Sequence, residues 1–182
     1  VFVLSVLNGK KNGKFLDIGS CWPKMINNTY LLESKFNWSG VLIELDENLA
    51  NECKMGRKSK VICGDATQVD YNQIFDELGE IDYMSLDIDG TPTLDVLKKL
   101  PLKKHKIKVI TFEHDTYRVG GFVRSESRKI FDDLGYVRIC SDVANENNIY
   151  EDWYVHPTVL ENRNLDVLKN NNRNWNDILF QD

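Results

Sequence analysis

Short apolar runs alternate with helix-like segments about five times along this chain, and this alternation limits the folds open to it. The clearest run is Lys14–Ile18, which breaks at Gly19. Such a run is typical of a buried parallel strand that enters the first loop of a nucleotide-binding α/β unit. A helix with one apolar face is predicted at Asn27–Phe36, and Asn27 and Asn28 can cap its start.

The same pattern predicts further strands and helices. Strands are predicted at Lys14–Ile18, Val41–Ile43, Lys60–Cys63, Ile81–Ile88, Ile107–Phe112, Tyr136–Cys140 and Asp152–Val155. Helices are predicted at Asn27–Phe36, Asp46–Met55, Tyr71–Leu78, Thr91–Leu100 and Glu126–Leu134. Together these elements favour an α/β fold with a doubly wound, mostly parallel sheet and helices on both faces. No helix separates the last two strands, so one of them is expected to be antiparallel, and Val143–Tyr150 is expected to be a mobile surface loop.

Length and composition indicate one globular domain. Of 182 residues, 42% are hydrophobic and 28% charged, so we predict a domain at 1–160 and a helical tail at 161–182, centred on Leu165–Leu179. The formal net charge of -5 gives no strong nucleic-acid signal. Neither a membrane-spanning run nor a signal peptide is visible, and the four cysteines form no C-x-x-C pair. A cytoplasmic location without structural zinc is expected, and the oligomeric state stays open.

Acidic residues end each of the first five predicted strands: Asp17, Glu44, Asp65, Asp87 and Glu113. Ligands of open α/β sheets bind beyond the carboxyl ends of the strands. Five carboxylates at one edge repel one another unless a cation or a donor-rich ligand relieves them.

These positions indicate the kind of ligand. Glu44 can accept both hydroxyls of a ribose, and Asp65 is placed to bind the amino group of a base. Only Gly19 of a G-x-G-x-x-G motif is present, which disfavours a pyrophosphate and hence a nicotinamide-dependent oxidoreductase. A nucleoside with positive charge, such as S-adenosylmethionine, matches this pattern.

Several sequence blocks resemble those of the FkbM-type class I methyltransferases. The matching blocks are Phe15-Leu16-Asp17-Ile18-Gly19, Asn28-Thr29-Tyr30-Leu31-Leu32-Glu33, Trp38-Ser39-Gly40-Val41-Leu42-Ile43-Glu44, Gly64-Asp65-Ala66, Tyr83-Met84-Ser85-Leu86-Asp87-Ile88-Asp89-Gly90 and Val109-Ile110-Thr111-Phe112-Glu113-His114. The chain differs from the family pattern at Ser20-Cys21-Trp22-Pro23, where Ala-Asn-Asp-Gly is usual, and at Asp89, where glutamate is usual.

The resemblance implies a seven-stranded class I, Rossmann-like fold and O-methylation of a hydroxyl on a sugar, glycan or other small molecule, with S-adenosylmethionine as donor. The cofactor-binding residues are then expected to be Asp17, Gly19, Ser20, Glu44, Asp65, Ala66 and Asp87.

A sugar hydroxyl needs a general base or a metal ion to lose its proton. Asp87, Glu113 and His114 are placed like the magnesium ligands of some class I O-methyltransferases, so Mg²⁺ is left open as a second cofactor. Without a metal, His114 is the preferred general base, and Asp87 is expected to be a second catalytic residue. His156 is expected to line the acceptor pocket. An alternative is a non-catalytic binding or scaffold module, in which Trp22-Pro23 obstructs the donor site.

Overall fold

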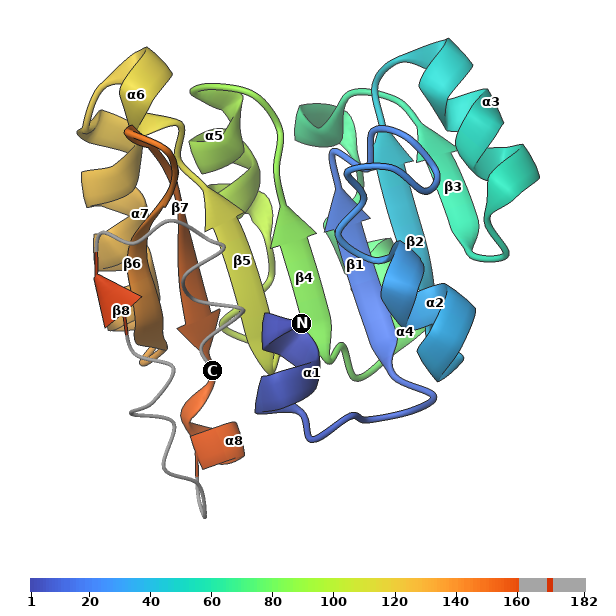
Figure 1. Ribbon diagram of the computed structural model, residues 1–182, viewed down its shortest axis with the longest axis horizontal. Helices are drawn as coiled ribbons and strands as arrows, with labels where there is room; N and C mark the ends of the chain where they lie inside the picture. The colour runs from blue at the N-terminus through green and yellow to red at the C-terminus, as the bar shows by residue number, and fades with distance from the viewer. Residues whose placement is uncertain (161–169, 172–182) are drawn as a thin grey trace.

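The alternating segments form one mixed sheet flanked by helices in the computed structural model, which describes residues 1–160 and 170–171 (Figure 1). The strand order is β3-β2-β1-β4-β5-β7-β6-β8. The strands are β1 (Lys14–Ile18), β2 (Ser39–Glu44), β3 (Lys60–Cys63), β4 (Tyr83–Leu86), β5 (Val109–Glu113), β6 (Val137–Asn145), β7 (Asn148–Val155) and β8 (Asn170–Asn171). β1 to β5 pair in parallel, and β7 pairs antiparallel with both β5 and β6. The predicted seven-stranded, mostly parallel sheet is confirmed, and β8 adds a two-residue pairing to β6.

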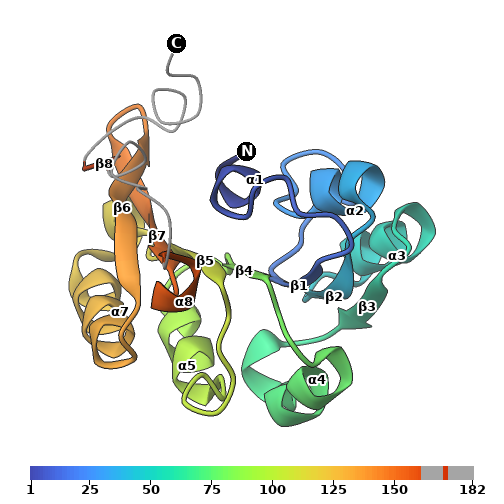
Figure 2. The same ribbon diagram turned by 90° about the horizontal axis from the view of Figure 1, so that it is seen from below.

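Helices cover both faces of the sheet, as predicted for a doubly wound fold (Figure 2). One face carries α1 (Phe2–Val6), α2 (Tyr30–Phe36) and α3 (Glu47–Gly56), and the other carries α4 (Tyr71–Leu78), α5 (Pro92–Lys99) and α7 (Phe122–Asp133). Three short helical segments complete the described chain: η1 (Ala66–Gln68), α6 (Thr116–Val119) and α8 (Pro157–Leu160).

Each face of the sheet has its own apolar core, because successive strand side chains point to opposite faces. In β1, Leu16 and Ile18 belong to the cluster under α4, α5 and α7, whereas Phe15 packs into the cluster under α1 to α3. All three are fully buried. A continuous apolar strand between two helical layers therefore explains the sequence pattern.

The order of the strands reverses between β1 and β4, and this creates the point at which open α/β sheets bind ligands. The strand after β1 in the chain, β2, lies on one side of β1, and β4 lies on the other. The loops after β1 and β4 therefore diverge to opposite layers and leave a crevice at the carboxyl edge.

One predicted element differs from the structure. Val143–Tyr150 is not a loop, because β6 and β7 continue through it as a hairpin that turns at Glu146. The asparagine-rich sequence suggested a loop, but its residues pair across the hairpin, for example Ala144 with Ile149. All four cysteines are free thiols.

The predicted tail helix at Leu165–Leu179 falls outside the described residues except for Asn170–Asn171, which form β8. None of the described helices is both long and apolar enough to cross a lipid bilayer.

Candidate functional site

A cleft of about 1070 Å³ lies at the carboxyl edge of the sheet, where the strand order reverses. Its walls include five of the predicted cofactor-binding residues: Gly19, Glu44, Asp65, Ala66 and Asp87. They come from the ends of β1 to β4, so the structure brings together residues that lie up to 68 positions apart in the sequence (Asp87 and Gly19). The volume is that of a site for a drug-sized ligand.

Gly19 is required at its position for a packing reason. Its φ of 86° is a conformation that side-chain-bearing residues rarely adopt, and a Cβ here would lie 1.9 Å from the backbone oxygen of Asp87. The glycine therefore lets the β1 loop pass directly over the end of β4.

The backbone donors of the β1 loop are already occupied. The N–H groups of Gly19 and Ser20 both donate to the carbonyl of Ile43, at 2.9 and 3.1 Å. The next N–H, of Cys21, donates to Glu44 Oε2 at 2.7 Å. A pyrophosphate site needs such groups free to bind the anion. The geometry therefore disfavours a dinucleotide, in agreement with the missing glycines.

Glu44 ends β2, and its side chain is 8% exposed. Its Oε1 accepts from the backbone N–H of Asp46 at 2.9 Å, while Oε2 accepts from Cys21. Two backbone donors fix the carboxylate in the cleft wall, and each oxygen keeps a lone pair for a ligand hydroxyl.

Asp65 and Ala66 follow β3 and form the far wall of the cleft. Asp65 caps η1: its Oδ1 accepts from the backbone N–H and the hydroxyl of Thr67, at 2.8 and 2.7 Å. These hydrogen bonds lower the pKa of Asp65 and keep it charged.

Two predicted cofactor residues, Asp17 and Ser20, do not line the cleft. Asp17 is 1% exposed and accepts from Thr29 Oγ1 at 2.6 Å, and burial raises its pKa to about 6. Ser20 is 2% exposed, and its hydroxyl lies 3.9 Å from the Cys53 sulfur. Both residues support the β1 loop from beneath instead of facing the cleft.

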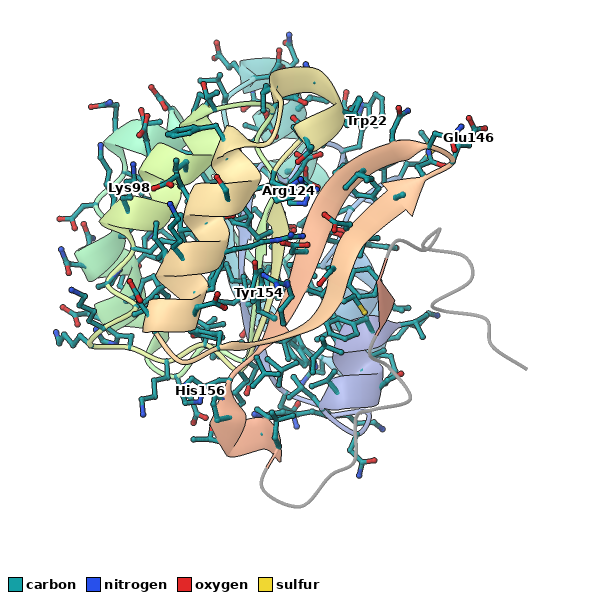
Figure 3. The ribbon with its side chains drawn as sticks, turned by 90° about the vertical axis from the view of Figure 1, so that its left-hand side faces the viewer. Trp22, Lys98, Arg124, Glu146, Tyr154 and His156 are labelled. Atoms are coloured by element: carbon teal, nitrogen blue, oxygen red, sulfur yellow. The ribbon has the colours of Figure 1, made fainter. Side chains whose placement is uncertain are left out.

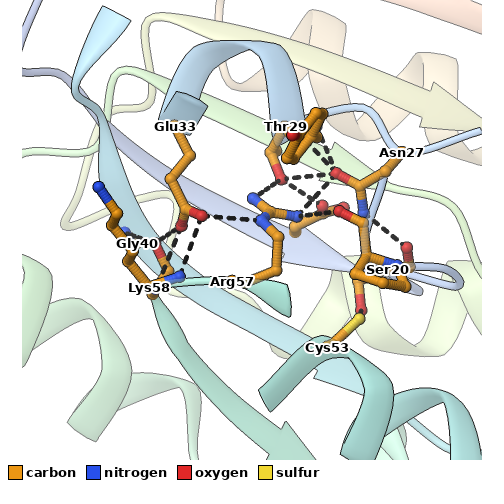
Figure 4. A network of polar contacts seen from close by, with 12 residues as sticks. Ser20, Asn27, Thr29, Glu33, Gly40, Cys53, Arg57 and Lys58 are labelled. Atoms are coloured by element: carbon orange, nitrogen blue, oxygen red, sulfur yellow. Dashed lines mark hydrogen bonds and ion pairs between the residues drawn. The ribbon is translucent and has the colours of Figure 1, made fainter. Parts of the chain in front are cut away.

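That support centres on Arg57, which the sequence pattern gave no reason to select (Figure 4). Its guanidinium is fully buried and contacts Glu33 at 3.0 Å, Asn27 Oδ1 at 2.9 Å and Thr29 Oγ1 at 3.0 Å. Asn27 in turn donates to the carbonyl of Ser20 at 2.7 Å. The network ties the β1 loop to α2 and to the end of α3.

Asn27 acts at the start of α2 as predicted, since its Oδ1 accepts from the N–H groups of Thr29 and Tyr30 at 3.0 and 2.8 Å. Asn28 does not cap the helix. Its amide donates to Ser85 Oγ at 2.9 Å and to Asp87 Oδ2 at 3.1 Å, so it connects the β1 loop to the end of β4.

Carboxylates crowd the next part of the carboxyl edge, at the ends of β4 and β5. Glu113 and Glu151 are directly opposite each other on β5 and β7, and Asp87 follows the neighbouring strand β4. Burial and a hydrogen bond to Asp87 raise the pKa of Glu113 to about 11. Burial raises the pKa of Glu151 to about 8. The sequence analysis missed Glu151, because only the hairpin register places it beside Glu113.

His114 is not placed as the sequence suggested. It follows Glu113 and therefore points to the opposite face of the sheet. It is fully buried, its Nδ1 lies 2.9 Å from Thr116 Oγ1, and its Nε2 lies 3.7 Å from Asp152 Oδ1. Arg128 also binds Asp152, at 2.7 and 2.8 Å. The prediction that His114 is a general base in the cleft is therefore wrong. His114 is instead a buried residue that lies against Asp152 of the hairpin.

His156 is also separated from the cleft. It follows β7, whose last residue Val155 pairs with Val109 at the start of β5, so it lies at the amino edge of the parallel strands. Figure 3 shows it at the end of the hairpin away from Glu146. Its Nδ1 lies 2.9 Å from Thr158 Oγ1. The prediction that it lines the acceptor pocket is wrong, because β7 runs antiparallel.

The predicted metal ligands Asp87, Glu113 and His114 do not form one group. Within the described residues, Glu113 instead lies with Asp89 and Asp115, and His114 lies with Asp142 and Asp152. The alternation of β5 explains this division, because Glu113 and His114 face opposite layers. The residues predicted to bind Mg²⁺ therefore do not fit a common ion.

No family model matches this sequence, and no curated protein matches it either. Solved structures do resemble it. The human methyltransferase 10 domain containing protein has a TM-score of 0.57 and 12% identity, over 85% of this chain and 79% of its own. Aeropyrum pernix fibrillarin with bound S-adenosyl-L-methionine has a TM-score of 0.54 and 12% identity, over 80% of this chain and 67% of its own. M. capricolum TrmK in complex with S-adenosyl-homocysteine has a TM-score of 0.52 and 16% identity, over 100% of this chain and 74% of its own.

At sequence identities this low, the similarity supports a shared fold and nothing further. The chain has the Rossmann-like fold of class I S-adenosylmethionine-dependent methyltransferases. The narrower resemblance to the FkbM-type family stays a prediction.

Proposed function

We propose that this protein is an S-adenosylmethionine-dependent methyltransferase that acts on a hydroxyl of a sugar, glycan or other small molecule. The observation that carries the proposal is the cleft at the strand-order reversal. Its lining carboxylates include Glu44, Asp65 and Asp87, and the backbone N–H groups that a phosphate would need are bonded elsewhere.

The cleft residues fit the parts of a positively charged nucleoside. Glu44 would hold the ribose hydroxyls, since its oxygens keep free lone pairs beside two backbone donors. Asp65 would accept from the amino group of the base, and Asp87 would lie near the cationic end. When bound, S-adenosylmethionine supplies a methyl group that its sulfonium has already activated.

On the acceptor side, Asp87 is the best-placed proton acceptor. It lines the cleft, and Asn28 holds its Oδ2 at 3.1 Å. Burial and the neighbouring Asp87 raise the pKa of Glu113 to about 11, which favours its protonated form. The Asp87 carboxylate would then accept the proton of the reacting hydroxyl.

Titration calorimetry with three ligands tests the proposal. Binding of S-adenosylmethionine and S-adenosylhomocysteine, but not of NAD, is expected. NAD binding alone would select an oxidoreductase, and silence with all three would select the non-catalytic scaffold module. A gain of one methyl mass on a hydroxylated acceptor, measured by mass spectrometry, completes the test.

A further inference from the structure

The carboxyl ends of β4 and β5 hold an acidic group that the donor cleft does not use, which we call the acid triad: Asp89, Glu113 and Asp115. One carboxylate oxygen from each lies within 4.8 Å of the other two. Asp89 also lines the donor cleft, so the triad borders the place where an acceptor would meet the donor.

Asp115 shows that the triad is incomplete without a ligand. The residue is 1% exposed, and its Oδ2 accepts from the backbone N–H of Gly90 at 2.9 Å. Its Oδ1 is buried and has no hydrogen-bond partner within the described part of the chain. A buried carboxylate oxygen without a donor costs roughly 1–3 kcal/mol or more, so a ligand that donates to it is favoured.

Neighbouring charges make a cation the favoured donor. Glu113 faces Glu151 directly across β5 and β7, and burial together with the neighbouring acids Asp87, Asp115 and Glu151 raises the pKa of Glu113, so a cation bound here would relieve their mutual repulsion. None of the ion pairs among the described residues gives Glu113 a cationic partner. Arg118 relieves only part of the charge: it contacts Asp89, and its Nη1 lies 3.5 Å from Asp115 Oδ2.

A monovalent ammonium fits this triad better than a divalent metal ion. Arg118 already occupies Asp89, and its positive charge would repel a second, doubly charged ion. An ammonium has three N–H donors, and one of them would satisfy the buried, unpartnered Oδ1 of Asp115.

We infer that the acceptor carries a protonated amine close to the hydroxyl that is methylated, as in an amino sugar, and that the acid triad binds this ammonium. The inference rests on the proposed methyltransferase function. The reacting hydroxyl would lie at Asp87 and the ammonium at the triad, on adjacent strands about 4.8 Å apart. Tyr117, half exposed beside Asp115, offers a ring face for the sugar.

The test compares glucosamine with N-acetylglucosamine, which share a ring and differ in charge. We expect glucosamine to bind at least tenfold more tightly when both are titrated into protein saturated with S-adenosylhomocysteine. Asp115→Asn should bring the ratio of the two dissociation constants close to one. Asparagine can still accept from Gly90 and tolerates the left-handed backbone of this position (φ 49°), so the variant is expected to fold.

Asp132→Asn is the matched control, because it removes the same charge at an exposed position of α7 and should keep the preference. Equal binding of the two sugars, binding of neither, or the same loss in both variants would overturn the inference. So would submillimolar binding of Mg²⁺ alone that Asp115→Asn abolishes. If the wild-type protein does not bind S-adenosylhomocysteine, that result counts against the proposed function instead. The preference between the two sugars can still be measured without S-adenosylhomocysteine.

Discussion

The two halves of the carboxyl edge treat their carboxylates differently. In the donor half, formed by β1 to β3, the cleft carboxylates of Glu44 and Asp65 accept from backbone N–H groups and stay fixed. In the acceptor half, formed by β4, β5 and β7, Glu113 and Glu151 are crowded together, and burial raises the pKa of both carboxyls. The first arrangement is preorganised for one ligand, whereas the second stays strained until a cation or proton relieves it.

The largest effect is expected from the network under the donor half. Arg57→Met should reduce the free energy of unfolding by about 3–5 kcal/mol, because it leaves the buried Glu33 carboxylate without its cation. Urea denaturation measures this change. The double variant with Glu33→Gln should recover part of the loss. If Arg57→Met alone costs less than about 1 kcal/mol, the network is not what holds the β1 loop.

Glu44→Ala tests the donor half at the ligand. We expect the affinity for S-adenosylhomocysteine to fall about 100-fold, since the variant removes a charged acceptor of two ligand hydroxyls. Calorimetry measures the change. Glu47→Ala, at an exposed position of α3, should leave the affinity unaltered. Equal affinities in wild type and Glu44→Ala would contradict the ribose assignment.

The pH dependence of the free energy of unfolding should differ between the donor half and the acceptor half of the carboxyl edge. A carboxyl whose pKa is raised by folding stabilises the fold below its unfolded pKa, and that stability is lost as the pH rises towards the folded pKa. For Asp17 this window runs from 3.8 to about 6, and for Glu151 from 4.5 to about 8. The free energy of unfolding should therefore keep falling between pH 6 and 8, by up to about 1.4 kcal/mol per unit from Glu151.

Glu151→Gln isolates that contribution. The variant keeps an oxygen that can accept from the Trp153 indole, but it cannot ionise. Its unfolding free energy should fall less steeply between pH 6 and 8 than that of the wild type, measured by urea denaturation at several pH values, and the remaining slope is expected from Glu113, whose raised pKa of about 11 also spans this range. An unchanged slope would place the titrating group elsewhere.

The sequence predicted much of the donor half but little of the acceptor half. Gly19, Glu44 and Asp65 lie within the first three units, where each acid directly follows a parallel strand, so local order determines their place. The acceptor half depends on pairings that are distant in sequence. The antiparallel course of β7 moved His156 to the other edge and brought Glu151 to Glu113.

Periodicity explains the remaining errors. Glu113 and His114 are consecutive, and consecutive strand residues face opposite layers, so the pair could not share a metal ion. Asp17 lies under the β1 loop for the same reason: its side chain enters the α2 layer and meets Thr29. Arg57 follows α3 in a polar segment, and only the folded chain shows that it is buried.

The smallest effect is expected at Trp22, where the sequence suggested an obstructed donor site. Its side chain is 39% exposed and is not part of the cleft wall, whereas the adjacent Cys21 is. The hydrogen bond from the Cys21 N–H to Glu44 fixes the loop at the cleft wall. Trp22→Ala should therefore change the dissociation constant of S-adenosylhomocysteine by less than about twofold. A tenfold gain in affinity by calorimetry would instead show that the loop closes the site, and would favour a scaffold over an enzyme.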